Sequence, residues 1–399
     1  MTVPNCRMNI AYISTWLMPS AETQTEQGIR TIEALVKGGH SVDLLCPRRR
    51  VDANRSAFEF EMAAYYGIEF AFPIFGVRSM PPLPLEAERL WSAMRTSLCR
   101  PRRYDLVLTR SRGVLLWCAL RGEPVVFETY RNFDKSYPIF RRLLLLSLYS
   151  GRCLGVVCHS EYSARSLQKL GILHNKVSVV YNGWNPALFE SSLSREAART
   201  LIGIEPKTNL VAYTGNVQPN KGLNSVLDVA VRLPDVTFLI VGGRQDDLAL
   251  LSNQIKQREL RNIVLVGHKK AASLGPFLLA ADILIIPPTD APLEKFGRTV
   301  LPMKTFMYLG AGRPIVAPRT PDIMEILADD VNAVLVEPDN PVATSDAIAS
   351  LLRDTERAWR LGKAAAVLSR QFTWEARADR LVKQFRKWLA MRGAAQTGG

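Results

Sequence analysis

The chain has 399 residues, too many for one ordinary hydrophobic core, so two domains of roughly 100–200 residues each are expected. Hydrophobic residues make up 47% of the chain and charged residues 22%, which excludes a wholly disordered protein. The net charge of +14 is concentrated in residues 1–200 and suits an anionic partner: nucleic acid, an acidic membrane surface or a phosphorylated substrate. A solvated basic surface without a dedicated partner explains the same excess.

The cysteines and the apolar runs indicate the cellular compartment of the protein. Six cysteines are scattered without a CxxC pair, which argues against a zinc ribbon or a disulfide framework and favours a reducing compartment. No secretory signal is apparent at the N-terminus, and apolar runs such as residues 143–148 are far shorter than the ~20 residues that span a bilayer. We therefore expect a cytoplasmic protein, soluble or peripheral on the inner face of the membrane.

Short runs of consecutive apolar and β-branched residues recur along the chain, separated by stretches with helical spacing. The runs are residues 9–14, 41–46, 104–108, 124–128, 154–159 and 177–181, then 209–214, 236–241, 262–266, 282–287, 314–317 and 333–336. Such runs are typical of parallel strands buried on both faces. Strand alternating with helix predicts an α/β protein with two Rossmann-like, doubly wound parallel sheets.

The same pattern sets the expected domain boundaries. We expect a first domain over residues 1–190, a second over 191–373, and a C-terminal helix over 374–399 that packs back toward the first domain and ends in a frayed tail. Ligands of doubly wound sheets bind beyond the carboxyl ends of the strands, and a cleft between two such domains is the default site.

A loop of residues 214–222 (TGNVQPNKG) follows the first apolar run of the second half. Gly215 leaves the backbone open at the strand end. Lys221 lies where the next helix begins, so an anion there would meet an ammonium group and free helix amides. The loop is not a Walker P-loop, because Gly222 follows Lys221. A plain surface turn remains the alternative.

A second segment, residues 294–304 (EKFGRTVLPMK), follows the run 282–287 and leads into another helix. Pro302 suits the first helical turn. Lys304 lies in that turn, where the helix dipole disfavours a cation unless an anion is bound, and Arg298 is placed to grip the same anion in a bidentate manner. The pattern predicts a phosphate site, with a lysine directed to water as the alternative.

Other candidates rest on weaker patterns. Gly242 and Gly243 follow a strand end and permit either close approach of a ligand or a tight turn. His159 and His268 end strands and are candidates for lining the cleft, but no histidine has metal-ligand spacing to another. Carboxylates at strand ends that suit a general base are Glu128, Asp290, Glu294 and Glu325.

Several stretches, in order and over nearly the whole chain, resemble the retaining glycosyltransferases of family four, which have the GT-B fold. The matching stretches are 176–185 (KVSVVYNGWN), 215–222, 238–243, 264–267, 280–282 and 301–317. This resemblance implies transfer of a sugar from a nucleotide-sugar, with UDP or GDP as the nucleotide, to a glycan or glycolipid acceptor. It implies retained anomeric configuration, no metal and no further cofactor.

The resemblance also implies roles for particular residues. The donor pyrophosphate would bind the second domain through Lys221, Lys304 and Arg298, which we name as the catalytic residues. The expected donor-binding residues are Gly215, Asn216, Gly242, Val266, His268, Glu294, Gly297, Thr299 and Met307. The expected acceptor side is in the first domain, with a loop over residues 13–28 closing on the sugar and with Glu128, Tyr130 and Gly28 as contacts.

The chain departs from the family pattern at four positions. Asn216 stands where the family has an arginine, Thr299 and Met307 stand where it has two glutamates, and Tyr130 replaces a histidine. These departures keep a second hypothesis open, a GT-B protein that binds a nucleotide-sugar as a partner subunit or regulator without transferring it. A dinucleotide oxidoreductase is disfavoured because the first strand–helix turn lacks GxGxxG, and no motif of a nucleic-acid-binding module is present.

Two basic stretches with apolar residues suit an anionic lipid surface, as in relatives that build polysaccharide or glycolipid. Residues 86–103 combine Trp91 and Met94 with several arginines, and residues 140–148 place Arg141 and Arg142 beside a leucine run. Core-facing helices with a solvated basic side are the alternative.

Overall fold

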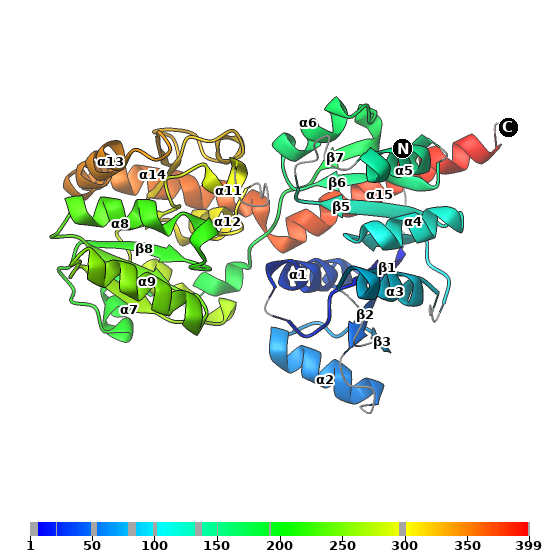
Figure 1. Ribbon diagram of the computed structural model, residues 1–399, viewed down its shortest axis with the longest axis horizontal. Helices are drawn as coiled ribbons and strands as arrows, with labels where there is room; N and C mark the ends of the chain where they lie inside the picture. Colours follow the sequence, from blue (N-terminus) through cyan, green and yellow to red (C-terminus); the bar gives the residue numbers. More distant parts are fainter. Residues whose placement is uncertain are drawn as a thin grey trace. The chain divides into compact units, whose positions relative to one another are not determined.

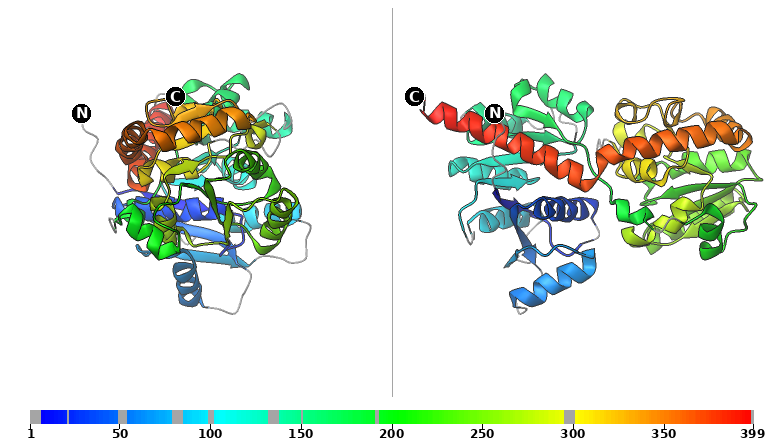
Figure 2. Two further views of the ribbon diagram at one scale, coloured as in Figure 1. Left: turned by 90° about the vertical axis from the view of Figure 1, so that its left-hand side faces the viewer. Right: turned by 180° about the vertical axis from the view of Figure 1, so that it is seen from behind.

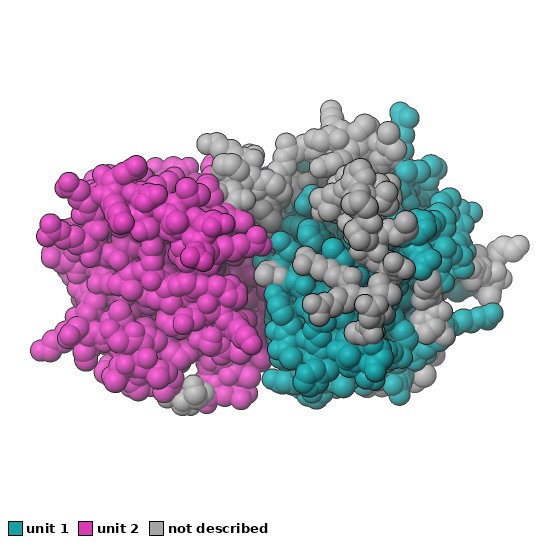
Figure 3. All heavy atoms as spheres, turned by 60° about the horizontal axis from the view of Figure 1, so that its bottom comes forward, with its two compact units in different colours: residues 1–182, 374–399 teal, residues 183–373 magenta. Residues whose placement is uncertain are grey.

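The computed structural model describes residues 7–20, 22–48, 54–78, 85–98, 102–131, 138–149, 151–190, 193–294 and 301–397 (Figure 1). Two compact units, coloured in Figure 3, comprise residues 1–182 with 374–399 (unit 1) and residues 183–373 (unit 2). The division comes earlier than the expected boundary at residue 190, because Trp184 already belongs to unit 2. Its backbone N–H donates to the Phe372 carbonyl at 3.0 Å, and its indole N–H donates to the Ser369 carbonyl at 2.9 Å.

Unit 1 is built on a seven-stranded parallel sheet with the order β3-β2-β1-β4-β5-β6-β7. The strands are β1 (Asn9–Ile13), β2 (Ser41–Arg48), β3 (Ile74–Arg78), β4 (Leu106–Thr109), β5 (Val125–Thr129), β6 (Cys153–Cys158) and β7 (Val177–Val179). The helices are α1 (Thr23–Lys37), α2 (Arg55–Tyr66), α3 (Leu85–Leu98), α4 (Arg112–Leu120), α5 (Pro138–Tyr149), α6 (Glu161–Lys169) and α15 (Trp374–Thr397), with the 3-10 turn η1 (His174–Lys176). Apolar residues of α3 to α6 pack on one face in a single core cluster.

Unit 2 is built on a six-stranded parallel sheet with the order β10-β9-β8-β11-β12-β13. The strands are β8 (Leu210–Thr214), β9 (Thr237–Val241), β10 (Ile263–Val266), β11 (Ile283–Ile285), β12 (Ile315–Pro318) and β13 (Val334–Val336). The helices are α7 (Arg195–Ile202), α8 (Leu223–Arg232), α9 (Gln245–Gln257), α10 (Gly275–Leu279), α11 (Ala291–Glu294), α12 (Lys304–Ala311), α13 (Pro341–Arg353) and α14 (Thr355–Ser369). The 3-10 turns are η2 (Pro186–Phe189), η3 (Pro219–Lys221), η4 (Ala271–Ser273), η5 (Ile323–Glu325) and η6 (Arg370–Phe372).

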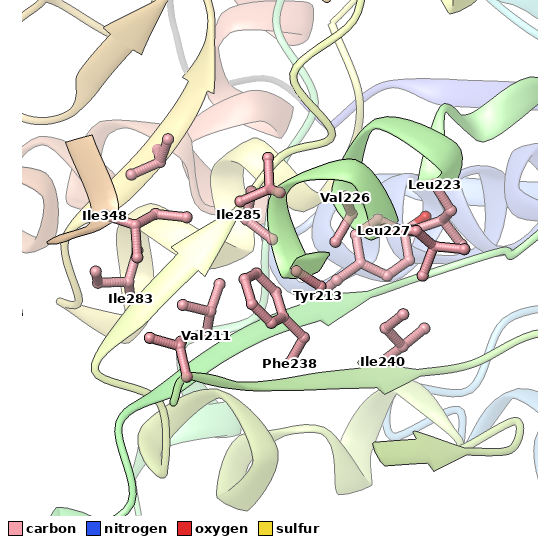
Figure 4. Packing of buried hydrophobic residues seen from close by; sticks show 14 of the residues in the cluster. Val211, Tyr213, Leu223, Val226, Leu227, Phe238, Ile240, Ile283, Ile285 and Ile348 are labelled. Carbon is pink, nitrogen blue, oxygen red and sulfur yellow. The ribbon is translucent and has the colours of Figure 1, made fainter. Parts of the chain in front are cut away.

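The core of unit 2 explains why its central strands read as unbroken apolar runs. Figure 4 shows Val226 and Leu227 of α8 gathered with Tyr213 of β8, Phe238 of β9 and Ile285 of β11. All five side chains are almost fully buried. Helices also cover the other face of the sheet, which leaves no solvent-facing position for alternating polar residues.

The twelve predicted strands are confirmed, and two doubly wound parallel sheets confirm the predicted fold class. Strand β3 was not predicted. It is short, follows Pro73, and has Gly76 at its centre, so its apolar run is too interrupted to read as a strand from sequence.

Helix α15 belongs to unit 1, where it packs against α1 (Figure 2). A frayed tail was expected at the end of this helix, but the helix continues to Thr397 among the described residues. Arg392 helps to hold this last part, donating to the carbonyl oxygen of Gly122 at 2.9 Å. Trp388 is a buried anchor of this helix, with 1% of its surface exposed.

Candidate functional site

The order of the strands in unit 2 reverses at β8. This strand pairs with β9 on one side and with β11 on the other. Strands β9 and β10 therefore extend the sheet to one edge, and β11, β12 and β13 extend it to the opposite edge. Ligands of open α/β sheets bind beyond the carboxyl ends of the strands at such a switch point. The loop of residues 214–222 leaves β8 there, and the segment that leads to Lys304 follows β11.

Two glycines allow the loops that follow β8 and β9 to contact each other closely at this edge of the sheet. Gly215 and Gly242 have φ angles of +136° and +124°, which residues with a side chain rarely adopt. A Cβ at Gly242 would collide with the carbonyl oxygen of Gly215. The two loops therefore form a layer of bare backbone, which lets a ligand approach the strand ends closely.

Lys304, the first residue of α12, extends its ammonium group over this backbone. The Nζ atom lies 3.7 Å from the centre of the Tyr213 ring. A Cβ built on Gly215 would lie 3.2 Å from the same Nζ atom. Burial, together with the positive charge of Lys221, holds the pKa of the Lys304 ammonium well below its usual value. Two ammonium groups thus converge on one place, and an anion bound there would relieve their repulsion.

Lys221 ends the short turn η3, immediately before α8. Gly222 follows it with a φ of +74° and fits closely against Thr289, whose methyl group a Cβ at Gly222 would strike. The Ser225 hydroxyl donates to the carbonyl oxygen of Gly222 at 2.6 Å. These contacts fix the Lys221 turn against the chain that leaves β11.

Two buried tyrosines, which were not predicted from sequence, hold the backbone of the site in place through hydrogen bonds. The Tyr213 hydroxyl donates to the carbonyl oxygen of Asn216 at 2.6 Å, which fixes the loop after β8. The Tyr308 hydroxyl accepts the backbone N–H of Thr214 at 2.7 Å, which ties α12 to the end of that strand. Burial raises the pKa of Tyr308 to about 12, so its hydroxyl stays neutral and keeps α12 joined to the end of β8. Aromatic residues in a strand and a helix carry no local signal of such a role.

The other expected donor-binding residues occupy varied positions. Val266 is half-buried at the end of β10, while Asn216 and His268 are exposed and Met307 is half-buried on α12. Glu294 is the last residue of α11. Gly297, Arg298 and Thr299 lie outside the described residues. The structure thus brings Lys221, Lys304, Gly215 and Gly242 together at one sheet edge.

In unit 1 the carboxylate of Glu128 is a buried structural anchor and does not face a ligand as expected. Only 1% of the residue is exposed, and its oxygens bind His159 Nε2 at 2.7 Å, Arg110 Nε at 2.9 Å and the guanidinium of Arg377. Burial alone would raise the pKa of this carboxyl, but the two guanidinium groups and the His159 bond hold it well below its usual value. Sequence could not show this, because Arg377 comes from α15.

Gly28 also departs from its expected place. The loop predicted over residues 13–28 ends sooner, because α1 begins at Thr23, and Gly28 is buried in that helix. A Cβ there would be 2.8 Å from the Tyr12 hydroxyl oxygen, so the glycine lets α1 pack against β1. Tyr130 is half-buried, with its ring centre 6.2 Å from that of His159.

Unit 1 has its own switch point between β1 and β4, and side chains that sequence did not single out line it. Ser14, Trp16 and Arg110 border a small cavity of about 30 Å³ there. Arg110 is fixed by Glu128 and by the Gln27 side-chain oxygen at 2.5 Å. Across the described residues, no group of three or more His, Cys, Asp or Glu side chains is placed to hold a metal ion.

Comparison with known families assigns both halves of the chain. The family described as "Glycosyl transferases group 1" matches residues 194–367, and the family described as "Glycosyltransferase Family 4" matches residues 29–188. The chain belongs to the group 1 glycosyltransferases of family 4. The first match lies within unit 2 and the second almost wholly within unit 1.

Curated relatives carry glycosyltransferase names. The D-inositol 3-phosphate glycosyltransferase of Segniliparus rotundus is 29% identical over 228 residues, which cover 55% of this chain and 48% of the relative. The protein of the same name from Mycolicibacterium smegmatis is 28% identical over 234 residues, covering 56% and 51%. The chain thus spans about half the length of these relatives.

Solved structures confirm the GT-B fold. HepE from Anabaena, solved in complex with UDP and glucose, has a TM-score of 0.70 at 17% identity, covering 95% of this chain and 100% of that one. Sucrose-phosphate synthase from Thermosynechococcus elongatus has a TM-score of 0.75 at 18% identity, covering 96% and 100%. Among the residues that the structure describes, no helix combines the length and apolar character needed to cross a bilayer.

Proposed function

We propose that this glycosyltransferase moves a sugar from a UDP- or GDP-sugar to an acceptor with retention of anomeric configuration and without a metal ion. The observation that carries the proposal is the position of Lys304, with its ammonium group beside the bare backbone of Gly215 and close to Lys221. An anionic diphosphate fits that position, since it meets two cations and open backbone at the start of α8.

The chemistry requires stabilisation of the leaving diphosphate. Negative charge grows on the phosphate oxygens as the bond to the sugar breaks, and fixed cations directed there lower the barrier. Lys221 and Lys304 supply that charge from two rigid elements, and Arg298 is a third candidate outside the described residues. In this proposal the acceptor attacks from the face that the diphosphate leaves, so retention requires no strong base on the protein.

The neighbours support a nucleotide-sugar donor. HepE from Anabaena was solved with UDP and with UDP-glucose. The relatives named D-inositol 3-phosphate glycosyltransferase carry a phosphorylated alcohol in their name. We propose that the acceptor here is a glycan or a lipid-linked intermediate and that unit 1 binds it.

We also propose that unit 1 binds an anionic membrane surface through α5. Leu146 and Tyr149 of this helix are 66% and 61% exposed, and Arg141 and Arg142 are exposed beside them. Apolar side chains flanked by arginines suit the boundary of an anionic bilayer. Cosedimentation with vesicles should then require anionic lipid and weaken with salt, and binding that is indifferent to both would contradict the proposal.

One set of residues favours a second function, binding of a nucleotide-sugar without transfer. Asn216, Met307 and Tyr130 replace residues that the family uses for donor and acceptor, and the exposed Asn216 side chain adds no charge for the diphosphate.

Incubation with a panel of UDP- and GDP-sugars, followed by chromatography of free sugar and nucleotide, separates the two functions. Slow release of sugar and nucleotide diphosphate from one donor, lost in Lys304→Met, supports a transferase. Binding of a donor without any release, even with an extract of candidate acceptors, would support the second function instead.

A further inference from the structure

A second cationic site lies in unit 1, around the edge strand β3. A cavity of about 290 Å³ is lined by Arg48, Arg55 and Arg95 together with aromatic side chains. This volume is at the lower end of the range for small-molecule sites. The cavity shares no lining residue with the small cavity at the β1/β4 switch point.

The three arginines come from three different elements. Arg48 is the last residue of β2, Arg55 is the first residue of α2, and Arg95 lies in the last turn of α3. Gly76 of β3 makes room for the first of them, because a Cβ at Gly76 would collide with the Arg48 side chain. The three arginines thus line one cavity through the packing of the sheet edge and not through a local sequence motif.

Aromatic rings orient two of the guanidinium groups. The central carbon of the Arg55 guanidinium lies 4.1 Å from the centre of the Phe75 ring, and that of Arg48 lies 5.9 Å from the Phe58 ring. Stacking holds the plane of a guanidinium while leaving its N–H groups directed outward. Arginines held in this way are preorganised for a ligand with several oxygens.

Two features show that the cluster is electrostatically incomplete. The Nε atom of Arg95 is buried and has no hydrogen-bond acceptor, which is costly for a charged donor. Arg55 occupies the first position of a twelve-residue helix, where the helix dipole disfavours a cation. Glu59 offsets part of this charge, since its carboxylate binds Arg55 Nε at 2.9 Å.

We propose that Arg48, Arg55 and Arg95 form a subsite for a phosphate group, carried by the acceptor or by a lipid headgroup. Guanidinium groups match the oxygens of a phosphate in bidentate geometry, and three of them from different directions suit a tetrahedral group. The cavity leaves space for the group that bears the phosphate. The inference rests on the proposed function in that unit 1 binds the acceptor.

Calorimetric titration of the full chain with glycerol 3-phosphate, and with glycerol as the neutral counterpart, tests the subsite. We expect glycerol 3-phosphate to bind, glycerol not to bind, and Arg95→Gln and Arg55→Gln each to weaken the affinity about 10-fold or more. The Arg55 side chain is half-exposed, so its substitution leaves the fold intact. Arg121→Gln removes the same charge from an exposed site in unit 1 and should change nothing.

A second arm separates the two sources of phosphate. If the phosphate belongs to lipid, vesicles of phosphatidylglycerol bind, those of phosphatidylcholine do not, and Arg95→Gln and Arg55→Gln weaken sedimentation while Arg121→Gln does not. The subsite is rejected if neither probe binds, or if all three variants behave like the parent in both arms. Titration with UDP on the same samples reports on unit 2 alone, so failure of the donor site is distinguished from failure of the subsite.

Discussion

The ammonium group of Lys304 lies 3.7 Å from the centre of the Tyr213 ring, although the two residues come from α12 and β8. The ring holds the lysine by its π face, and the Tyr213 hydroxyl holds the loop after β8 through the Asn216 carbonyl. One side chain thus fixes both the cation and the backbone that a diphosphate would contact.

Lys304→Met should weaken UDP binding by roughly 10-fold or more, because a charge-assisted hydrogen bond contributes about 1.5–3 kcal/mol. Lys363→Met is a matched control: this lysine also stacks on a ring, 4.6 Å from that of Trp359, but on an exposed surface of unit 2. Calorimetric titration of both variants checks the prediction. Equal affinities in the two variants would show that Lys304 does not contact the donor.

Binding of UDP should be accompanied by proton uptake. The pKa of Lys304 is lowered by burial and by Lys221, and a bound diphosphate raises it again, so the complex holds more protons than the free protein. Above about pH 7, where phosphate is ionised, affinity should therefore fall as pH rises. Titrations in buffers of different ionisation enthalpy measure this uptake. Lys304→Met should abolish most of it, and full uptake in that variant would assign the proton to another group.

Gly242→Ala should abolish donor binding while leaving unit 2 folded. The residue has a φ of +124°, and the added Cβ would meet the Gly215 carbonyl oxygen, so the two loops must separate. Gly203→Ala is the control, since Gly203 also has a positive φ, +72°, but faces open space away from the site. Backbone strain should cost each variant about 1 kcal/mol of stability, and the clash with the Gly215 carbonyl oxygen should add to the loss in Gly242→Ala. Only the first should lose UDP binding in a thermal-shift assay.

The loops could be predicted from sequence, and the contacts that complete the site could not. Gly215, Lys221 and Lys304 follow strands whose apolar runs are plain, and the rule that ligands bind at carboxyl ends selects those loops. The support from Tyr213 depends on the packing of α12, which no local pattern reveals. The bond between Arg377 and Glu128 spans 249 residues of sequence, and the carboxylate therefore resembled an available strand-end acid.

Gly155→Ala should destabilise unit 1. A Cβ at this position of β6 would overlap the indole of Trp388, which is buried and held by a 2.8 Å bond from its N–H to the Asn175 carbonyl. Overpacking of this kind costs about 1–3 kcal/mol. Chemical denaturation measures the loss, and Gly155→Ala combined with Trp388→Phe should recover part of it. If the double variant recovers no stability, the loss in Gly155→Ala does not come from contact with Trp388.

The His159 site predicts loss of stability in mild acid. Asn182 donates its amide to His159 Nδ1 at 3.1 Å while Nε2 donates to Glu128, so the ring is neutral. Burial lowers the pKa of His159 to about 4, so below about pH 6.5 the unfolded chain takes up a proton that the folded protein does not.

The free energy of unfolding should therefore fall by up to roughly 3 kcal/mol as pH drops from about 6.5 to 4. It should fall further below that, as the depressed pKa of Glu128 is approached and its ion pairs are lost. His159→Gln keeps a neutral donor to Glu128, and its stability should change less between pH 6.5 and 4. The exposed His268→Gln should follow the parent protein. Denaturation curves at several pH values decide, because identical pH profiles for His159→Gln and the parent would show that His159 is not the group that titrates.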